Sequence, residues 1–256
     1  MSSLYVYTLI SLAVTALLLT VAGLRLQTQR ERDRLLRFFA VSTVIVHYSS
    51  LWVDFFTTGS AVAGSNMLLP IYPCNIVMWM LVIVAFQKNR AGTVLNMLTE
   101  FVFLAGSFCA LIGIVLNENY FSTPTLTDYT VLKGLLSHST MLAGCLYLAV
   151  GKYVHIRVAN TASVAAGLTL FLAIGFCMNA LFDAFGLETP NAMYLREVPF
   201  PDYPWLTSFV MGLAGCAVIL LFTSVYELCT LPKQERTLYQ LKRAIENRLD
   251  AYKTRK

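Results

Sequence analysis

The sequence predicts an all-α, polytopic membrane protein with seven transmembrane helices. Hydrophobic residues make up 57% of the 256 positions and charged residues only 13%, whereas roughly 25% of the residues in a soluble globular domain are charged. Seven apolar stretches of about 20 residues follow one another, each long enough to cross about 30 Å of hydrocarbon at about 1.5 Å per residue. The basic residues concentrate in every second connection between these stretches. These features exclude an ordinary soluble domain.

The expected spans cover residues 4–24, 38–57, 67–86, 94–116, 130–150, 162–185 and 206–226. The first span is expected to remain in the protein, because residues 1–4 carry no Lys or Arg and the apolar run is too long for the core of a signal peptide. No connection is long enough to act as a linker between domains. We therefore expect residues 1–232 to form one transmembrane domain and residues 233–256 to form a cytoplasmic tail.

The basic residues predict the orientation of the chain. Seventeen of the 19 Lys and Arg residues follow the first, third, fifth and seventh spans, and only Lys133 and Arg196 fall on the other side. The positive-inside rule then places the N-terminus outside and the C-terminus in the cytoplasm of a multi-pass cell-membrane protein. The net charge of +5 is explained by this topology, so it does not indicate nucleic-acid binding.

The tail is predicted to be a basic amphipathic helix. Its apolar positions share one helical face: Leu238, Leu241, Ile245 and Leu249. Such a helix suits docking on anionic headgroups of the inner leaflet, and an ordinary solvated terminal helix is the alternative. Membrane lipids are the expected partners, and the sequence does not determine an oligomeric state.

The six cysteines predict neither disulfides nor a metal centre. All lie inside spans or at the cytoplasmic end of the seventh, and no CxxC pair is present. Phosphate-binding glycine loops, HExxH and GxSxG motifs are also missing from the sequence. We therefore expect no metal and no cofactor.

Polar residues of several spans are expected at one depth, in the outer half of the membrane. They are Asp54, Cys74, Asn75, His138, Asn179 and Asp183. Taken singly, a cysteine in a span is most often a packing residue and a histidine most often an interhelical hydrogen-bond partner. Their shared depth instead indicates a site or a water-filled cavity, because ionisable groups are costly inside a bilayer.

The stretch LPIYPCN, residues 69–75, predicts a helix start below the outer membrane surface. Proline is tolerated in the first turn of a helix, so Pro70 and Pro73 would place Cys74 near a helix N-terminus. The positive end of the helix dipole and the free N–H groups there favour a thiolate and a developing oxyanion. His138 would then exchange a proton with the sulfur. The simpler interpretation is that the two prolines only begin a helix.

Two further groups are expected around this layer. His47 and Glu100 are predicted near the bilayer centre, where they would pair either as a proton relay or as a hydrogen bond that fixes helix register. The longest outer connection, FGLETPNAMYLREVPFPDYPW, lies over the polar layer and is interpreted as a lid or a packed loop. Its candidate residues are Asn191, Tyr194 and Arg196.

LPIYPCN, the HS of LLSHSTMLAGCLYL, and NAMYLREVP followed by YPW resemble the YwaF family of bacterial integral membrane proteins. That family is similar to transmembrane protein 164, an acyltransferase that remodels ether phospholipids through a cysteine and a histidine. The resemblance carries the cysteine to Cys74 and the histidine to His138. Two positions depart from the family pattern, since Tyr72 stands in place of a His and Ala192 in place of a Tyr.

The favoured function is acyl transfer on a glycerophospholipid or lysophospholipid. Cys74 would attack an ester and His138 would act as general base, with Asn75 or Asn179 assisting the oxyanion and Asp183 orienting the imidazole. A lipid-ester hydrolase would use the same residues. The alternatives are a transporter or small-molecule binding protein that uses His47 and Glu100, and a scaffold that recruits a partner through its tail.

Overall fold

The structure is a computed structural model and describes residues 3–26, 28–59, 69, 71–87, 92–115, 129–186 and 191–253. This described part of the chain is helical and contains no strand. The α-helices are α1 (Ser3–Arg25), α2 (Gln29–Thr58), α4 (Pro73–Phe86), α5 (Thr93–Phe101), α6 (Ser107–Val115), α7 (Tyr129–Val150), α8 (Thr161–Ala184), α9 (Ser208–Thr230) and α10 (Thr237–Lys253). A π-helical turn, η1 (Val102–Gly106), joins α5 to α6, and the 3₁₀ turns are η3 (Val158–Asn160), η4 (Ala192–Tyr194) and η5 (Lys233–Glu235).

Six helices in the described part are long and apolar enough to cross a membrane, which confirms a multi-pass, all-helical protein. The third expected span, residues 67–86, differs from its prediction. Its helix α4 has 14 residues, or about 21 Å of rise, because Tyr72 has extended φ and ψ angles and Pro73 is the first helical residue. Residues 67, 68 and Pro70 lie outside the described residues.

The helix α2 begins nine residues before the predicted span 38–57. The side chain of Thr28 accepts a hydrogen bond from the N–H of Glu31, and Glu31 caps the backbone of Thr28 in return. Such a capping box satisfies two donors at the helix start. The charged segment QRERDR therefore belongs to the helix.

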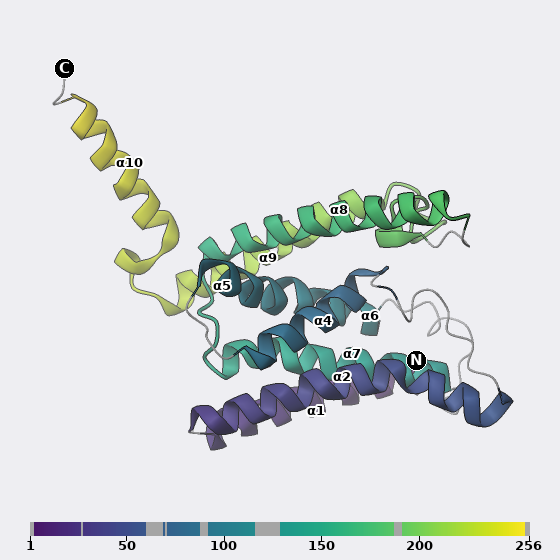
Figure 1. The fold of residues 1–256 in the computed structure, drawn as a ribbon. Coiled ribbons are helices and arrows are strands. Elements are labelled where there is room, and N and C mark those ends of the chain that lie inside the picture. Colours follow the sequence, from purple (N-terminus) through teal and green to yellow (C-terminus); the bar gives the residue numbers. More distant parts are fainter. Residues whose placement is uncertain are drawn as a thin grey trace.

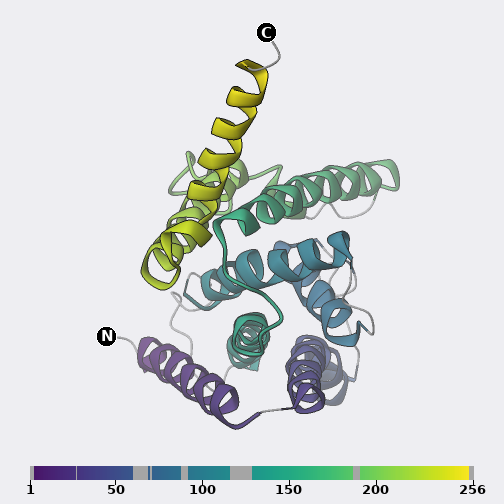
Figure 2. The same cartoon turned by 90° about the vertical axis from the view of Figure 1, so that its left-hand side faces the viewer.

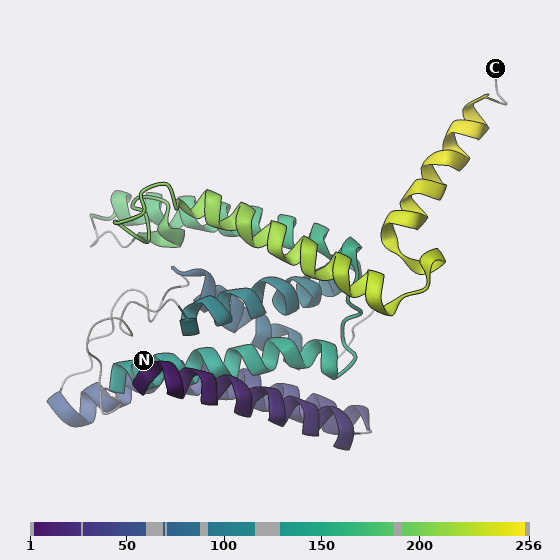
Figure 3. The same cartoon turned by 180° about the vertical axis from the view of Figure 1, so that it is seen from behind.

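The helices form three layers (Figures 1 and 3). One outer layer holds α1, α2 and α7, the other holds α8 and α9, and the continuous α5–η1–α6 lies with α4 between them. The core contains fully buried side chains of α2, α4, η1 and α7, among them Leu36, Val77, Leu81, Val102 and Tyr147. Large apolar side chains of α1 and α9 are exposed, among them Leu17 and Leu221, as expected for surfaces that face lipid.

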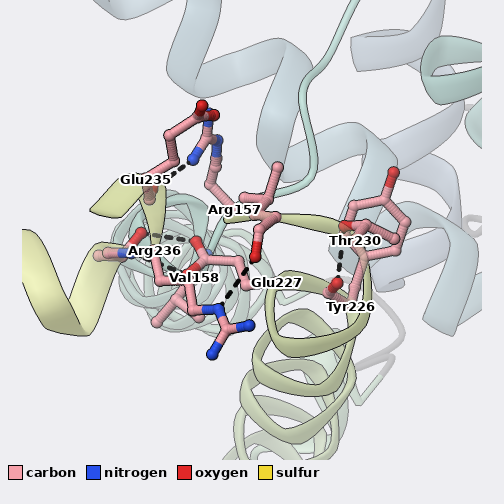
Figure 4. A network of polar contacts seen from close by, with 9 residues as sticks. Arg157, Val158, Tyr226, Glu227, Thr230, Glu235 and Arg236 are labelled. Atoms are coloured by element: carbon pink, nitrogen blue, oxygen red, sulfur yellow. Dashed lines mark hydrogen bonds and ion pairs between the residues drawn. The ribbon is translucent and has the colours of Figure 1, made fainter. Parts of the chain in front are cut away.

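The helix α10 leaves the bundle beyond η5 and contacts little of it (Figures 1 and 2). Its beginning is held by Glu227 of α9, which is 2% exposed. Glu227 accepts hydrogen bonds from the N–H of Val158 at 2.7 Å, and from the N–H and hydroxyl of Thr237 at 2.8 and 2.6 Å. The guanidinium of Arg157 donates a further hydrogen bond to the backbone carbonyl of Glu235 at 2.6 Å. Figure 4 shows Arg157, Val158, Glu227 and Glu235 of this network, which ties the start of the tail to η3 and α9.

Candidate functional site

The start of α4 is fixed by a backbone contact with the loop 191–207. The N–H of Met193 donates to the carbonyl of Ile71 at 2.9 Å, and the ring of Tyr72 stacks on that of Tyr194, with centroids 5.0 Å apart. These contacts hold the extended residues before Pro73. Pro73 therefore begins α4 at the point where residues 71 and 72 pack against the loop 191–207.

Cys74 is the second residue of α4 and is half-buried. Its thiol donates to Oδ1 of Asn75 at 3.5 Å, and the N–H of Asn75 donates to the carbonyl of Tyr72 at 3.0 Å. The sulfur thus lies in the first turn of α4, at the positive end of the helix dipole. Asn75 itself is buried and contacts the thiol through its carbonyl oxygen.

The imidazole of His138 is oriented by its own helix. Nδ1 donates to the carbonyl oxygen of Gly134, one turn earlier in α7, at 2.8 Å. A ring nitrogen that donates to a carbonyl carries the proton, so Nε2 is left as the acceptor. The ring lies against Gly113 of α6, where an added Cβ would be 2.3 Å from Nε2. The hydrogen bond to the Gly134 carbonyl and the close contact with Gly113 therefore fix the position of the imidazole.

Cys74 and His138 line one cavity of about 330 Å³. The cavity extends from the loop 191–207 to Val164 and Ile219, and most of its lining is apolar. Its walls come from η1, α6, α8 and α9, with Phe108, Ile112, Leu168, Phe171 and Met211 among them. Gly215 of α9 keeps that wall open, since a Cβ there would be 3.0 Å from the ring of Phe108. Cavities of this size and character bind small apolar ligands.

The loop 191–207 closes one end of the cavity. Tyr194 lines the cavity together with Pro199 and Phe200, and Met193 and Tyr194 both have left-handed φ angles of 54°. The hydroxyl of Ser208 donates to the carbonyls of Met193 and Tyr194 at 2.8 and 2.7 Å. Residues 193 and 194 of the loop are thus hydrogen-bonded to the start of α9.

Asn179 and Asp183 fasten this loop to α8 and do not line the cavity. Asn179 accepts from the N–H of Ala192 at 3.0 Å and donates to its carbonyl at 3.3 Å. Arg196 donates to the carbonyl of Asn179 and to the carboxylate of Asp183, both at 2.7 Å, and Asn191 accepts from the N–H of Arg196 at 2.9 Å. This corrects two expected contacts, because Asn179 binds the loop backbone and Asp183 binds Arg196.

The expected pair of His47 and Glu100 is not formed. Nε2 of His47 is buried without a hydrogen-bond partner among the residues the structure describes, and the ring lies edge-on to Tyr48, with centroids 5.1 Å apart. The helices α2 and α5, which carry the two residues, belong to different layers (Figure 1). Asp54 is half-buried on α2 and also lies outside the cavity lining.

Sequence reasoning missed several residues of the site. Gly134 could have been found, because it precedes His138 by four residues and a helical side chain can reach that carbonyl. Gly113, Cys109 and Cys216, which also line the cavity, give no signal of their own. Within the described ranges, no group of three His, Cys, Asp or Glu side chains could hold a metal ion.

Comparison with known proteins assigns a family. The model of the TMEM164 family matches residues 1–226. No curated protein and no solved structure matches the chain. The match covers every helix that lines the cavity, and it agrees with the resemblance of LPIYPCN and the HS segment. The chain therefore belongs to the TMEM164 family and is a multi-pass membrane protein.

Proposed function

We propose that the protein is a membrane acyltransferase that moves an acyl chain between glycerophospholipids or lysophospholipids through a thioester on Cys74. The observation that carries this proposal is the apolar cavity lined by both Cys74 and His138. The thiol is the nucleophile, and His138 is the general base because its Nε2 is left to accept a proton.

The reaction has two half-reactions. In the first, Nε2 of His138 takes the thiol proton while the sulfur attacks the ester carbonyl. The carbon–oxygen bond then breaks, and the imidazolium returns the proton to the leaving alkoxide. In the second, the hydroxyl of an acceptor lipid gives its proton to Nε2 and attacks the thioester. The thiolate leaves and recovers the proton from the imidazolium.

The start of α4 is suited to the charge that develops in both steps. The N–H of Cys74 lies in the first turn of α4, at the positive end of the helix, and would donate to the carbonyl oxygen as it becomes an oxyanion. The apolar walls hold the acyl chain and keep water scarce. The acyl group of the thioester is then transferred to a lipid hydroxyl in preference to hydrolysis.

We further propose that the chain crosses the cell membrane seven times, with α4 as a short third crossing. The charge distribution then places the N-terminus outside, the site in the outer half, and the tail in the cytoplasm. Exposed Leu238, Leu241, Ile245 and Leu249 on α10 would dock on anionic headgroups of the inner leaflet. The hydrogen bonds to Glu227 support this role, because they hold the start of α10 against the end of α9.

Cys74→Ala and His138→Gln test the proposal. Membranes that contain the parent protein should form a thiol-acylated species at position 74 and shift the acyl chains of their glycerophospholipids, and neither variant should do so. Cys109→Ala and Cys216→Ala are matched controls, because both sulfurs line the same cavity without a described role. The mechanism would be refuted if a control variant lost as much acyl transfer as Cys74→Ala. It would also be refuted if Cys74→Ala still formed the thiol-acylated species and shifted the acyl chains. Release of free fatty acid without transfer would indicate the hydrolase.

A further inference from the structure

The cavity that contains Cys74 and His138 ends blind on the side away from the loop 191–207. Its lining there comes from three walls and is buried on each of them: Ala105 of η1, Val164 of α8 and Ile219 of α9. One turn further along α9, Thr223 is fully buried and its hydroxyl donates to the carbonyl of Ile219 at 2.9 Å. Packed side chains therefore close this blind end.

The length of the cavity can be followed along α9. Ser208, Met211, Gly215 and Ile219 all line it, and their spacing of three or four residues keeps them on one face of the helix. Ser208 is hydrogen-bonded to the loop, so this face runs from the loop to the blind end over about 16 Å of helical rise. One leaflet of a bilayer has a hydrocarbon thickness of about 15 Å, half of the whole core. The cavity is therefore as long as the acyl chain of a membrane lipid.

Cys74 lies toward the loop end of this cavity. Tyr72, two residues earlier, stacks on Tyr194 of the loop, and both residues line the cavity together with Cys74. None of the described lining residues is Asp, Glu, Lys or Arg. A chain joined to the sulfur thus has an apolar path toward Ile219, with no charged side chain along it.

The width of this path depends on Gly215. A Cβ atom at position 215 would be 3.0, 3.5 and 3.6 Å from three atoms of the Phe108 ring. Phe108 lines the cavity from α6, on the wall that faces α9. Gly215 is buried and precedes Ile219 by one turn. A chain that reaches the blind end therefore passes the point where α9 carries no side chain.

We propose that this cavity limits the length of the acyl chain that the protein transfers. The chain runs from Cys74 along α9, and its methyl end meets the blind end at Ala105, Val164 and Ile219. The substrates are then esters of unbranched chains of ordinary membrane-lipid length, and longer chains are rejected because their last methylenes do not fit. This inference rests on the acyl transfer proposed above.

Photolabelling of the full chain in neutral detergent tests where a bound chain lies. One probe is palmitic acid with a diazirine at its methyl end, and the other carries the diazirine beside the carboxyl group. The first should label segments that contain Val164 or Ile219, and the second should label segments that contain Cys74 or Tyr194. Excess palmitic acid should prevent both reactions. The proposal is overturned if both probes label the same segments, or if neither labels the blind end.

Ile219→Ala is the discriminating variant, because it removes carbon atoms from the blind end and adds none. The full chain is placed in vesicles of phosphatidylcholines with chains from dodecanoyl to eicosanoyl, and mass spectrometry identifies the chain on Cys74. The ratio of eicosanoyl to dodecanoyl thioester should rise about tenfold, since one methylene in an apolar pocket can discriminate by that factor. Ile219→Phe should lower the same ratio.

Val218→Ala and Val218→Phe are the matched controls. Val218 is exposed on α9 and does not line the cavity, so both variants should keep the chain profile of the parent protein. Gly215→Ala should reduce thioesters of the longest chains and keep those of chains too short to pass Phe108. A shift in the Val218 variants equal to that in the Ile219 variants would contradict a limit set by the blind end.

The length limit and the acyl transfer can fail separately. If Cys74 is acylated with the same chain profile in the parent protein and in both Ile219 variants, the length limit is wrong and acyl transfer stands. If the methyl-end probe labels the blind end and Cys74 is never acylated, the cavity binds the chain as described and the thioester mechanism is wrong.

Discussion

Gly113 of α6 lies in direct contact with the imidazole of His138 on α7. A Cβ atom at position 113 would be 2.2 Å from Cδ2 and 2.3 Å from Nε2 of the ring. These distances are far below van der Waals contact, so only glycine allows the ring its observed place. The nitrogen that the proposed mechanism uses as a base is thus positioned by a residue that carries no side chain.

Gly113→Ala is expected to displace the ring of His138 and to lower acyl transfer about a hundredfold, since a misplacement of about 1 Å can have such an effect. The fold should be destabilised by only about 1–3 kcal/mol, typical of an overpacked site. Gly212→Ala is the control, because its Cβ would meet only Leu168 at 3.9 Å. Lipid acyl-chain analysis and thermal unfolding measure the two effects. If Gly113→Ala transfers acyl chains as well as the parent protein, His138 is not the general base.

Asn179→Ala is expected to loosen the loop over the cavity. The substitution leaves the buried N–H and carbonyl of Ala192 without their hydrogen-bond partners. This lowers the free energy of unfolding by about 1–3 kcal/mol. Proteolysis within residues 191–207 should become faster. Asn96→Ala, at an exposed position of α5, should leave both stability and cleavage unchanged. If the two variants behave alike, the asparagine does not hold the loop.

Glu227→Gln is expected to detach the start of α10. The amide places an N–H donor where the carboxylate now accepts hydrogen bonds from the N–H groups of Val158 and Thr237. Loss of hydrogen bonds to a charged group lowers the free energy of unfolding by about 1.5–3 kcal/mol. Hydrogen exchange in residues 233–240 measures the release. Glu246→Gln is the control, because its ion pair with Lys242 is exposed on α10 and contributes little. Unaltered exchange in Glu227→Gln would mean that other contacts hold the tail.

His47→Phe tests the proton-relay alternative. Because Nε2 has no hydrogen-bond partner in the described part of the chain, a phenyl ring should be tolerated with a change in stability below about 1.5 kcal/mol. Acyl transfer should also stay near the parent level. Complete loss of function together with a stable fold would restore His47 to a catalytic or transport role.

The sequence predicted a level in the membrane for each candidate residue and could not predict which way its side chain faces. Counting residues along each span predicts one level for Cys74, His138, Asn179 and Asp183. Two of them line the cavity, and the other two hold the loop beside it. Depth follows from the position of a residue along its helix, whereas the face it presents depends on how that helix is rotated against its neighbours.

By itself, the sequence determined that this is an all-helical, multi-pass membrane protein with a helix starting at LPIYPCN. Apolar runs, charges and prolines act locally, and the lack of water in the bilayer leaves helices as the way to satisfy the backbone. Only the tertiary structure decided which side chains meet. Tyr72 stacks on Tyr194, Gly113 seats His138, and Val158 and Thr237 meet on Glu227. These contacts join residues far apart in the chain, and they depend on helix tilt and packing that no local pattern encodes.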